Sequence, residues 1–128
     1  MTDLKIGRYM SPLTLSIGVE QSLKTAAAKM TEHKVRHLPV LDGGRLVGVL
    51  SERDVHWLAS LGTDTSSIAV SEAMSDIPYI VPAETLARTV VQKMHADRLG
   101  SALIQEDGRP VGIFTTTDAL RLCGDLLS

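Results

Sequence analysis

Apolar residues recur at helical spacing in two stretches of this chain. In each stretch they lie three or four residues apart, the spacing that places side chains on one face of an α-helix. The positions are Leu23, Ala26, Ala27 and Met30 in the first stretch, and Leu86, Val90, Val91 and Met94 in the second. The spacing predicts two amphipathic helices, each of which buries this apolar face.

Short β-prone runs surround both predicted helices. They lie at residues 13–17, 38–41 and 45–50 in the first half of the chain and at 77–81 in the second. Asp42-Gly43-Gly44 separates the runs at 38–41 and 45–50, and Glu106-Asp107-Gly108 holds the equivalent place. Asp-Gly favours a tight hairpin because glycine adopts positive φ without steric cost. Each half therefore reads as strand, helix, hairpin and a second helix, the last over residues 51–60 or 115–126.

The two halves are copies of one another at a constant offset. Residues 44–54 (GRLVGVLSERD) match residues 108–118 (GRPVGIFTTTD), an offset of 108 − 44 = 64, and Met10-Ser11 matches Met74-Ser75 at the same offset. A repeat of this kind indicates two similar structural units. We predict two tandem β-α-β-β-α copies, residues 1–64 and 65–128.

The order of elements predicts an α/β fold of the two-layer α+β kind, with helices covering one face of each sheet. A copy of this size is small for a stable core, so we expect the two copies to pack around a pseudo-twofold axis and to share a core. Two equivalent clefts would then lie between the copies.

Composition narrows the range of functions. Of 128 residues, 44% are hydrophobic, 3% are aromatic, and the formal net charge is −2. No stretch approaches the roughly 20 apolar residues of a membrane helix, and the charge lacks the basic excess of a general nucleic-acid binder. The one cysteine cannot form an internal disulfide. We expect a cytoplasmic protein without a membrane or nucleic-acid partner.

Each copy contains a strand-to-helix junction of the form Gly-apolar-apolar-hydroxyl-x-x-Asp. The junction residues are Gly48, Ser51 and Asp54 in the first copy, and Gly112, Thr115 and Asp118 in the second. One interpretation is a capping box, in which the hydroxyl begins the helix and the acid three residues later bonds back to its N–H. Helix starts favour these residue types whatever the function of the protein.

The same junction also suits a nucleotide. The first turn of a helix carries unpaired N–H groups and partial positive charge, which can hold a phosphate together with the hydroxyl. The aspartate one turn later offers two acceptor oxygens for the paired hydroxyls of a ribose. The glycine lacks a side chain and permits close approach of a flat base. The occurrence of two such junctions, 64 residues apart like the rest of the repeat, favours the functional interpretation.

The sequence resembles a tandem pair of cystathionine-β-synthase (CBS) domains, together called a Bateman module, over residues 8–126. The resemblance rests on the paired Met-Ser starts, the strand Arg36-His37-Leu38-Pro39-Val40, the Asp-Gly turns and the two junctions. It implies a regulatory module, not an enzyme, that binds AMP, ADP, ATP or S-adenosylmethionine in clefts between the copies. No cofactor is required, and pairs of such modules commonly form a disc-shaped homodimer.

The resemblance also implies roles for single residues. Asp54 and Asp118 would hold ribose, and Ser51 and Thr115 would contact phosphate.

The two copies differ in their basic residues. Arg36 and His37 stand where the family often places groups that contact phosphate, but the matching residues are Gly100 and Ser101, and Arg53 is matched by a threonine. We therefore expect the two clefts to differ in affinity or ligand.

The remaining histidines, the cysteine and the tryptophan do not predict a metal site or a catalytic site. His33 and His37 are four apart, but the helix is expected to end at about residue 34, so no metal site is predicted. Cys123 has no neighbouring base, and no catalytic residue is predicted. Trp57 follows the first junction and is interpreted as a packing or dimer contact in preference to a base-stacking platform.

Three functions remain open. The first is a regulatory module that senses an adenosyl ligand and acts through an unidentified partner protein or a change of oligomer. The second is a structural dimerisation module whose junctions are only helix caps. The third is a nucleic-acid binder that uses a basic patch, which would comprise Lys34, Arg36, His37, Arg45 and Arg53.

Overall fold

The computed structural model describes residues 4–76 and 79–128. The chain divides into two compact units, which we call the central unit (Leu15–Ile77) and the terminal unit (Met1–Thr14 with Pro78–Ser128). In chain order the elements are η1 (Ile6–Arg8), β1 (Ser11–Pro12), β2 (Ile17–Gly18), α1 (Leu23–His33), β3 (His37–Asp42), β4 (Arg45–Ser51), α2 (Glu52–Ser60), η2 (Thr65–Ser67), α3 (Val70–Ala73), β5 (Ile80–Val81), α4 (Ala87–Asp97), β6 (Ser101–Glu106), β7 (Arg109–Thr115) and α5 (Thr116–Leu127). This is the predicted two-layer α+β fold in two repeats.

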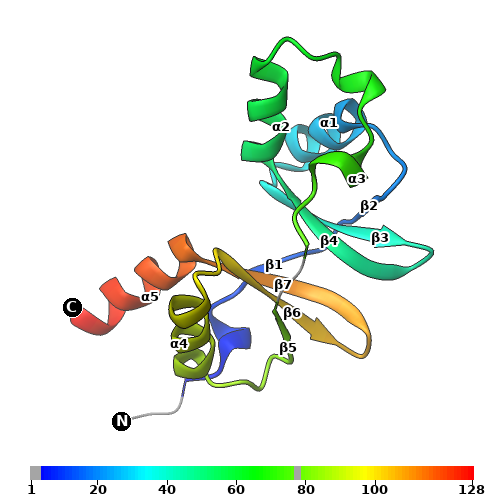
Figure 1. Cartoon of the computed structure of the whole chain (residues 1–128). Helices are drawn as coiled ribbons and strands as arrows, with labels where there is room; N and C mark the ends of the chain where they lie inside the picture. Colours follow the sequence, from blue (N-terminus) through cyan, green and yellow to red (C-terminus); the bar gives the residue numbers. More distant parts are fainter. Residues whose placement is uncertain (1–3, 77–78) are drawn as a thin grey trace. The chain divides into compact units, whose positions relative to one another are not determined.

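The central unit is built on a sheet of order β2-β3-β4. Strand β2 runs parallel to β3, and β3 runs antiparallel to β4. Helices α1, α2 and α3 lie on one side of this sheet (Figure 1). The buried cluster between the two layers comprises Ile17, Leu23, Ala26, Met30, Leu38, Val40, Leu50, Val55 and Val70. All are aliphatic or methionine, as the scarcity of aromatic residues requires.

The terminal unit has the same plan with one further strand. Its sheet has the order β1-β7-β6-β5, in which β5 runs parallel to β6 and the other neighbours are antiparallel. The buried cluster comprises Ile6, Val81, Ala87, Val90, Met94, Ala102, Ile104, Phe114 and Leu122. Each unit therefore has a buried cluster of its own, and a core shared by the two copies stays a prediction.

Each unit includes the first residues of the other sequence copy, which we call the lead-in segment: residues 65–76 in the central unit and residues 4–14 in the terminal unit. The Val70 N–H donates to the Gln21 carbonyl at 2.7 Å in the central unit, and the Ile6 N–H donates to the Thr85 carbonyl at 2.8 Å in the terminal unit. These pairs are equivalent at the offset of 64. Backbone groups of each lead-in segment are thereby paired with the other copy. The bounds of the two sequence copies, 1–64 and 65–128, stay a prediction.

The predicted helices are present. The Ser22 side chain caps α1 by accepting a hydrogen bond from the Thr25 N–H at 3.1 Å, and Lys34 ends this helix in the left-handed region at φ 55°. In α4 the expected burial of Val91 is wrong, because Val91 is 37% exposed and Ala87 is buried instead. Val90 and Met94 of the predicted stripe are buried as expected.

Both hairpin turns have positive φ at their two central residues. These residues are Gly43 and Gly44 in the central unit, and Asp107 and Gly108 in the terminal unit. Two-residue turns of this handedness match the twist of the strands they join. The hairpins, β3–β4 and β6–β7, thereby hold the two junctions in equivalent positions.

The predicted strand at residues 13–17 is wrong over most of its length. Only Ile17 of this run lies in a strand, since β2 pairs with β3 through two residues. In the equivalent run, residues 77 and 78 lie outside the described residues, and β5 comprises Ile80–Val81. Within the described parts of the chain, no helix is both long and apolar enough to cross a membrane.

Candidate ligand-binding site

Both junctions form complete capping boxes. In the central unit the Ser51 Oγ accepts the Asp54 N–H at 3.1 Å, while the Ser51 N–H donates to Asp54 Oδ2 at 3.2 Å. In the terminal unit the corresponding distances between Thr115 and Asp118 are 3.3 and 2.9 Å. Each hydroxyl also donates to the Oδ2 of its aspartate. The capping interpretation is therefore confirmed in both copies, and it occupies one carboxylate oxygen of each aspartate.

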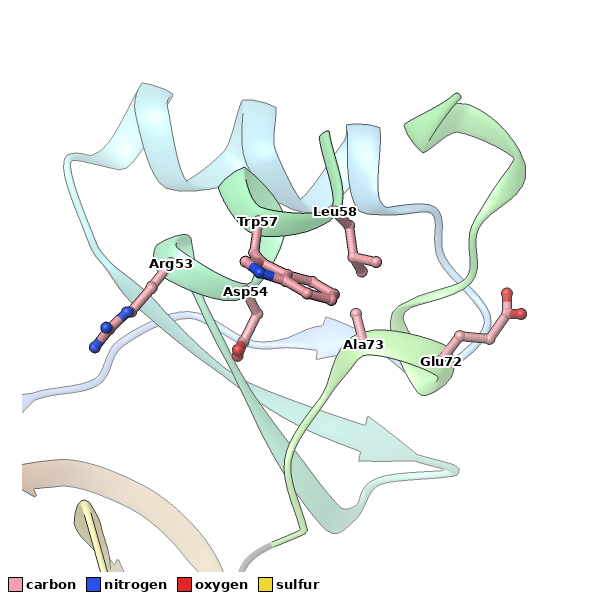
Figure 2. Close-up of a pocket in the computed structure, with 6 residues that line it drawn as sticks. All are labelled: Arg53, Asp54, Trp57, Leu58, Glu72 and Ala73. Carbon is pink, nitrogen blue, oxygen red and sulfur yellow. The ribbon is translucent and has the colours of Figure 1, made fainter. Parts of the chain in front are cut away.

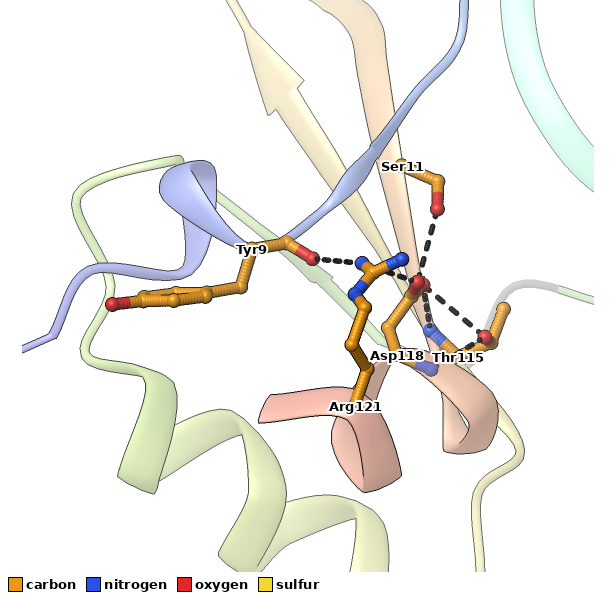
Figure 3. A network of polar contacts seen from close by, with 5 residues as sticks. All are labelled: Tyr9, Ser11, Thr115, Asp118 and Arg121. Carbon is orange, nitrogen blue, oxygen red and sulfur yellow. Dashed lines mark hydrogen bonds and ion pairs between the residues drawn. The ribbon is translucent and has the colours of Figure 1, made fainter. Parts of the chain in front are cut away.

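The second oxygen of Asp118 is bound as well. Its Oδ1 accepts the Ser11 hydroxyl at 3.0 Å and an Arg121 guanidinium N–H at 2.9 Å (Figure 3). The same Arg121 nitrogen lies 3.3 Å from the Tyr9 carbonyl oxygen, which holds the guanidinium in place. A carboxylate has about four acceptor positions, and Asp118 has all four filled. The residue is only 4% exposed.

The second oxygen of Asp54 is different. Among the residues that the structure describes, none donates a hydrogen bond to Asp54 Oδ1, and the side chain is half-buried. At the offset of 64, Ser11 corresponds to Ser75 and Arg121 corresponds to Trp57. An indole has one N–H donor and no charge, so Trp57 cannot replace the guanidinium. Asp54 therefore keeps an oxygen that can accept hydrogen bonds from a bound molecule.

A cavity of about 370 Å³ opens beside Asp54. It is lined by residues of α2 and α3, namely Arg53, Asp54, Trp57, Leu58, Glu72 and Ala73 (Figure 2). Its walls combine apolar surface with one cation and two carboxylates. A volume of this size lies within the range of about 300–1,000 Å³ that small-molecule sites occupy. The sequence singled out Arg53 and Asp54 as ligand-binding residues, and the structure places both at this cavity.

The other basic candidates lie near the junction but do not line this cavity. His37 is the cross-strand partner of Ser51 in the β3–β4 ladder, so the two side chains are neighbours on one face of the sheet. The Arg36 carbonyl accepts the Glu52 N–H at 2.8 Å, which places Arg36 beside the first turn of α2. That hydrogen bond occupies the Glu52 N–H, one of the N–H groups in the first turn of α2 that were expected to be available to a phosphate.

The two junction glycines have a packing role. A Cβ on Gly48 would lie 2.6 Å from the Met74 sulfur and 2.9 Å from the Ser75 carbonyl oxygen, and a Cβ on Gly112 would collide with the Met10 side chain. The lead-in segment therefore lies directly against each glycine. Their part in admitting a flat base stays a prediction.

Sequence reasoning missed part of each site. It interpreted Trp57 as a packing or dimer contact and assigned no role at the site to Glu72, Ala73, Ser11 or Arg121. The repeat contained a signal, because Trp57 and Arg121 occupy equivalent positions one turn after the junction aspartates. In the described residues no three His, Cys, Asp or Glu side chains come together as they would around a metal ion.

Three known proteins illustrate what the chain is similar to. Hypoxic response protein 1 of Mycobacterium tuberculosis is 31% identical over 108 residues, which cover 82% of this chain and 75% of that protein. Inosine-5′-monophosphate dehydrogenase of Korarchaeum cryptofilum is 28% identical over 104 residues. That match covers 81% of this chain, and the chain spans only 21% of the dehydrogenase.

The third is a solved structure, the CBS domain pair of protein MJ0100 in complex with 5′-methylthioadenosine and S-adenosyl-L-methionine. It is 23% identical and superposes with a TM-score of 0.78 over 97% of this chain and 98% of that one. At this identity the likeness concerns the fold. The model of the CBS domain family matches residues 6–57 and again residues 70–125, one match for each copy. The chain therefore belongs to the CBS domain family.

Proposed function

We propose that the chain is a regulatory module that binds an adenosyl ligand at the Asp54 junction of the central unit. The observation that carries this proposal is the carboxylate oxygen of Asp54 that no described residue bonds, at the edge of a 370 Å³ cavity. The MJ0100 domain pair, whose structure contains 5′-methylthioadenosine and S-adenosyl-L-methionine, supports the class of ligand.

Each residue of the junction has a role in this proposal. Asp54 Oδ1 accepts hydrogen bonds from the ribose hydroxyls, the part that an acidic residue plays in dinucleotide-binding folds. Ser51 and the basic residues Arg36, His37 and Arg53 favour a ligand that carries phosphate. Gly48 keeps the strand close to the lead-in segment, as described above.

The equivalent residues Gly112, Thr115 and Asp118 have a different role. Asp118 can accept a ribose only if Arg121 or Ser11 gives up its hydrogen bond, so ligand binding there competes with the bonds that hold the terminal unit together. We therefore propose that Asp118 is first a structural residue and that the Asp54 junction is the stronger site.

Regulation follows from differential affinity. A ligand shifts a conformational or oligomeric equilibrium only by as much as it prefers one state over the other. The module would act on a protein partner or through a homodimer of CBS pairs. No catalytic step is proposed for it.

Calorimetric titration with AMP, ADP, ATP, 5′-methylthioadenosine, S-adenosylmethionine and NAD(H) tests the proposal. We expect at least one of these to bind, and Asp54→Ala to weaken binding by roughly a hundredfold through the lost charge-assisted hydrogen bonds. Asp118→Ala is the matched control, and its affinity should remain close to that of the wild type. Absence of binding by every adenosyl compound would overturn the proposal, as would unchanged affinity in Asp54→Ala.

The second candidate function is a structural dimerisation module. Two observations favour it: the hydroxyl and the aspartate of each junction bond each other in a capping box, and large apolar side chains are exposed on the second helix of each copy. These side chains are Trp57, Leu120, Leu126 and Leu127. Under this alternative, Asp54→Ala would lower stability by about 1 kcal/mol, as lost caps do, and no adenosyl compound would change the sedimentation coefficient.

A further inference from the structure

Trp57 is the aromatic residue among those that line the cavity. The residue is 64% exposed, although an indole is one of the largest apolar surfaces that a protein can bury. It lies on α2 one helical turn after Asp54, a spacing that puts both side chains on one face of the helix. An aromatic ring left in water beside a half-buried carboxylate is a feature that the folding of the central unit does not require.

The geometry brings Trp57 and Asp54 to the same space. Figure 2 shows the indole extending from α2 toward Ala73 on α3, with the Asp54 carboxylate on the same side of the helix. Ala73 contributes only a methyl group, so the space beside the ring stays open. In the same view Arg53 and Glu72 point away from the indole on either side. Between them the lining comprises Trp57, Leu58 and Ala73 together with the Asp54 carboxylate.

The terminal unit shows what happens when this ring is absent. Arg121 occupies the position equivalent to Trp57, and it bonds to Asp118 and fills the last acceptor position of that carboxylate. The tryptophan in the central unit therefore has two consequences: it leaves Asp54 Oδ1 unbonded and adds a flat apolar surface next to it. Both suit a ligand that has a flat base joined to a pair of hydroxyls.

We propose that Trp57 is the stacking platform for the base of a purine nucleoside whose ribose hydroxyls bond to Asp54. The proposal rests on the proposed function and adds the residue that recognises the base. Stacking uses the π-face of the base, which every purine has, and it strengthens binding without reading hydrogen-bond edges. Trp57 would thus hold the base of the nucleoside and Asp54 its sugar. The part of the ligand beyond the sugar would extend toward the charged residues Arg53 and Glu72.

The chain contains one tryptophan, so intrinsic fluorescence reports on Trp57 alone. AMP and S-adenosylmethionine would be titrated into the full chain, with fluorescence and calorimetry recorded on the same samples. Ribose 5-phosphate, which has the sugar but no base, is the control ligand. We expect fluorescence quenching that saturates at the calorimetric Kd for the adenosyl compounds and no quenching by ribose 5-phosphate.

Three variants complete the experiment. Trp57→Leu keeps an apolar side chain but removes the ring, and should weaken AMP binding about tenfold or more. Trp57→Phe keeps a smaller ring and should recover part of the affinity. Leu61→Ala, at another exposed apolar residue just beyond the end of α2, is the matched control and should bind as the wild type does. Because Trp57 is exposed, circular dichroism should show all three folded.

The outcomes separate this inference from the function on which it rests. Calorimetric binding without a fluorescence change, or with wild-type affinity in Trp57→Leu, would overturn the stacking platform and leave the adenosyl-binding function standing. Absence of calorimetric binding in the wild type would overturn both. Fluorescence that depends on protein concentration and not on AMP would identify Trp57 as an interface between copies of the chain, which also overturns the inference.

Discussion

The junctions at Asp54 and Asp118 have the same local chemistry and different surroundings. Both aspartates close a capping box with the hydroxyl three residues earlier. In the terminal unit Ser11 and Arg121 bond the remaining oxygen, whereas no described residue bonds it in the central unit. The comparison teaches that a local motif specifies a helix cap, and that residues from other segments decide whether the carboxylate is also available to a ligand.

The lead-in segments contribute to this difference. Tyr9 and Ser11 of the terminal unit correspond to Ala73 and Ser75 of the central unit at the offset of 64. The Tyr9 carbonyl and the Ser11 hydroxyl both take part in the Asp118 network. In the central unit Ala73 lines the cavity, and Ser75 is exposed. One junction is therefore closed by its own chain, and the other is left open.

The largest effect is expected from deleting the Asp118 carboxylate, compared with the same change at Asp54. Asp118→Ala should lower the free energy of unfolding of the terminal unit by about 3 kcal/mol, because it removes a buried carboxylate and leaves half-buried donors of Ser11 and Thr115 without acceptors. Arg121 is 60% exposed and adds little to this figure. Asp54→Ala should cost the central unit about 1 kcal/mol, the usual value of a lost cap. Urea denaturation of both variants measures the two losses, and equal losses would remove the distinction between the junctions.

The junction glycines should give the next largest effect. Gly48→Ala should destabilise the central unit by about 2 kcal/mol, because its Cβ meets the Ser75 carbonyl as well as Met74. Gly112→Ala meets only side-chain atoms of Met10 among its nearest neighbours. Met10→Ala should therefore restore much of the stability that Gly112→Ala loses. Met74→Ala should restore less of the stability that Gly48→Ala loses, because the Ser75 carbonyl stays in place. Double-mutant cycles on thermal unfolding provide the measurement, and equal coupling in the two cycles would contradict the prediction.

Arg121 and Trp57 provide a smaller contrast. Arg121→Ala removes an ion pair with one exposed partner and should cost about 0.5–1 kcal/mol, with a loss that shrinks as salt is added. Trp57→Ala, at the equivalent position, should change stability by less than about 0.5 kcal/mol because the ring is exposed. Chemical denaturation at low and high salt compares the two variants. A large, salt-independent loss in Trp57→Ala would show that the indole is a structural group.

The smallest effect concerns a surface pair that only the terminal unit has. Lys5 bonds Glu84 at 2.8 Å and lowers the pKa of that carboxyl, first through the hydrogen bond and then through its charge. The equivalent residues are Ala69 and Glu20, which cannot form an ion pair. The pair stabilises the terminal unit above the ordinary carboxyl pKa of about 4.3, and this contribution is lost as pH falls through the folded-state pKa.

Titration of the Glu84 carboxyl by NMR tests this last prediction. Lys5→Ala should raise the Glu84 pKa toward its ordinary value. An unchanged Glu84 pKa in that variant would show that the lysine is not its cause.

Much of the fold could be predicted because it is encoded in short-range patterns. The apolar stripes located both long helices, the Gly-rich turns located both hairpins, and the hydroxyl-x-x-Asp pattern located the starts of α2 and α5. The strand at residues 13–17 was wrong because its pairing with β3 extends over two residues only. A short parallel pairing depends on where a distant strand lies, which local residue preference does not encode.

The sequence by itself determined the repeat, the family and the residues of both capping boxes, because each depends on spacing along the chain. Only the tertiary structure decided what lies beside each box. In the structure Arg121 and Ser11 donate hydrogen bonds to Asp118, whereas Asp54 lies with Trp57 at a cavity. The reason is that the second oxygen of Asp118 is bonded by Ser11, 107 residues away in the sequence, and by Arg121 on the next helical turn, whereas no described residue bonds that of Asp54. Whether such hydrogen bonds form depends on packing and not on the motif.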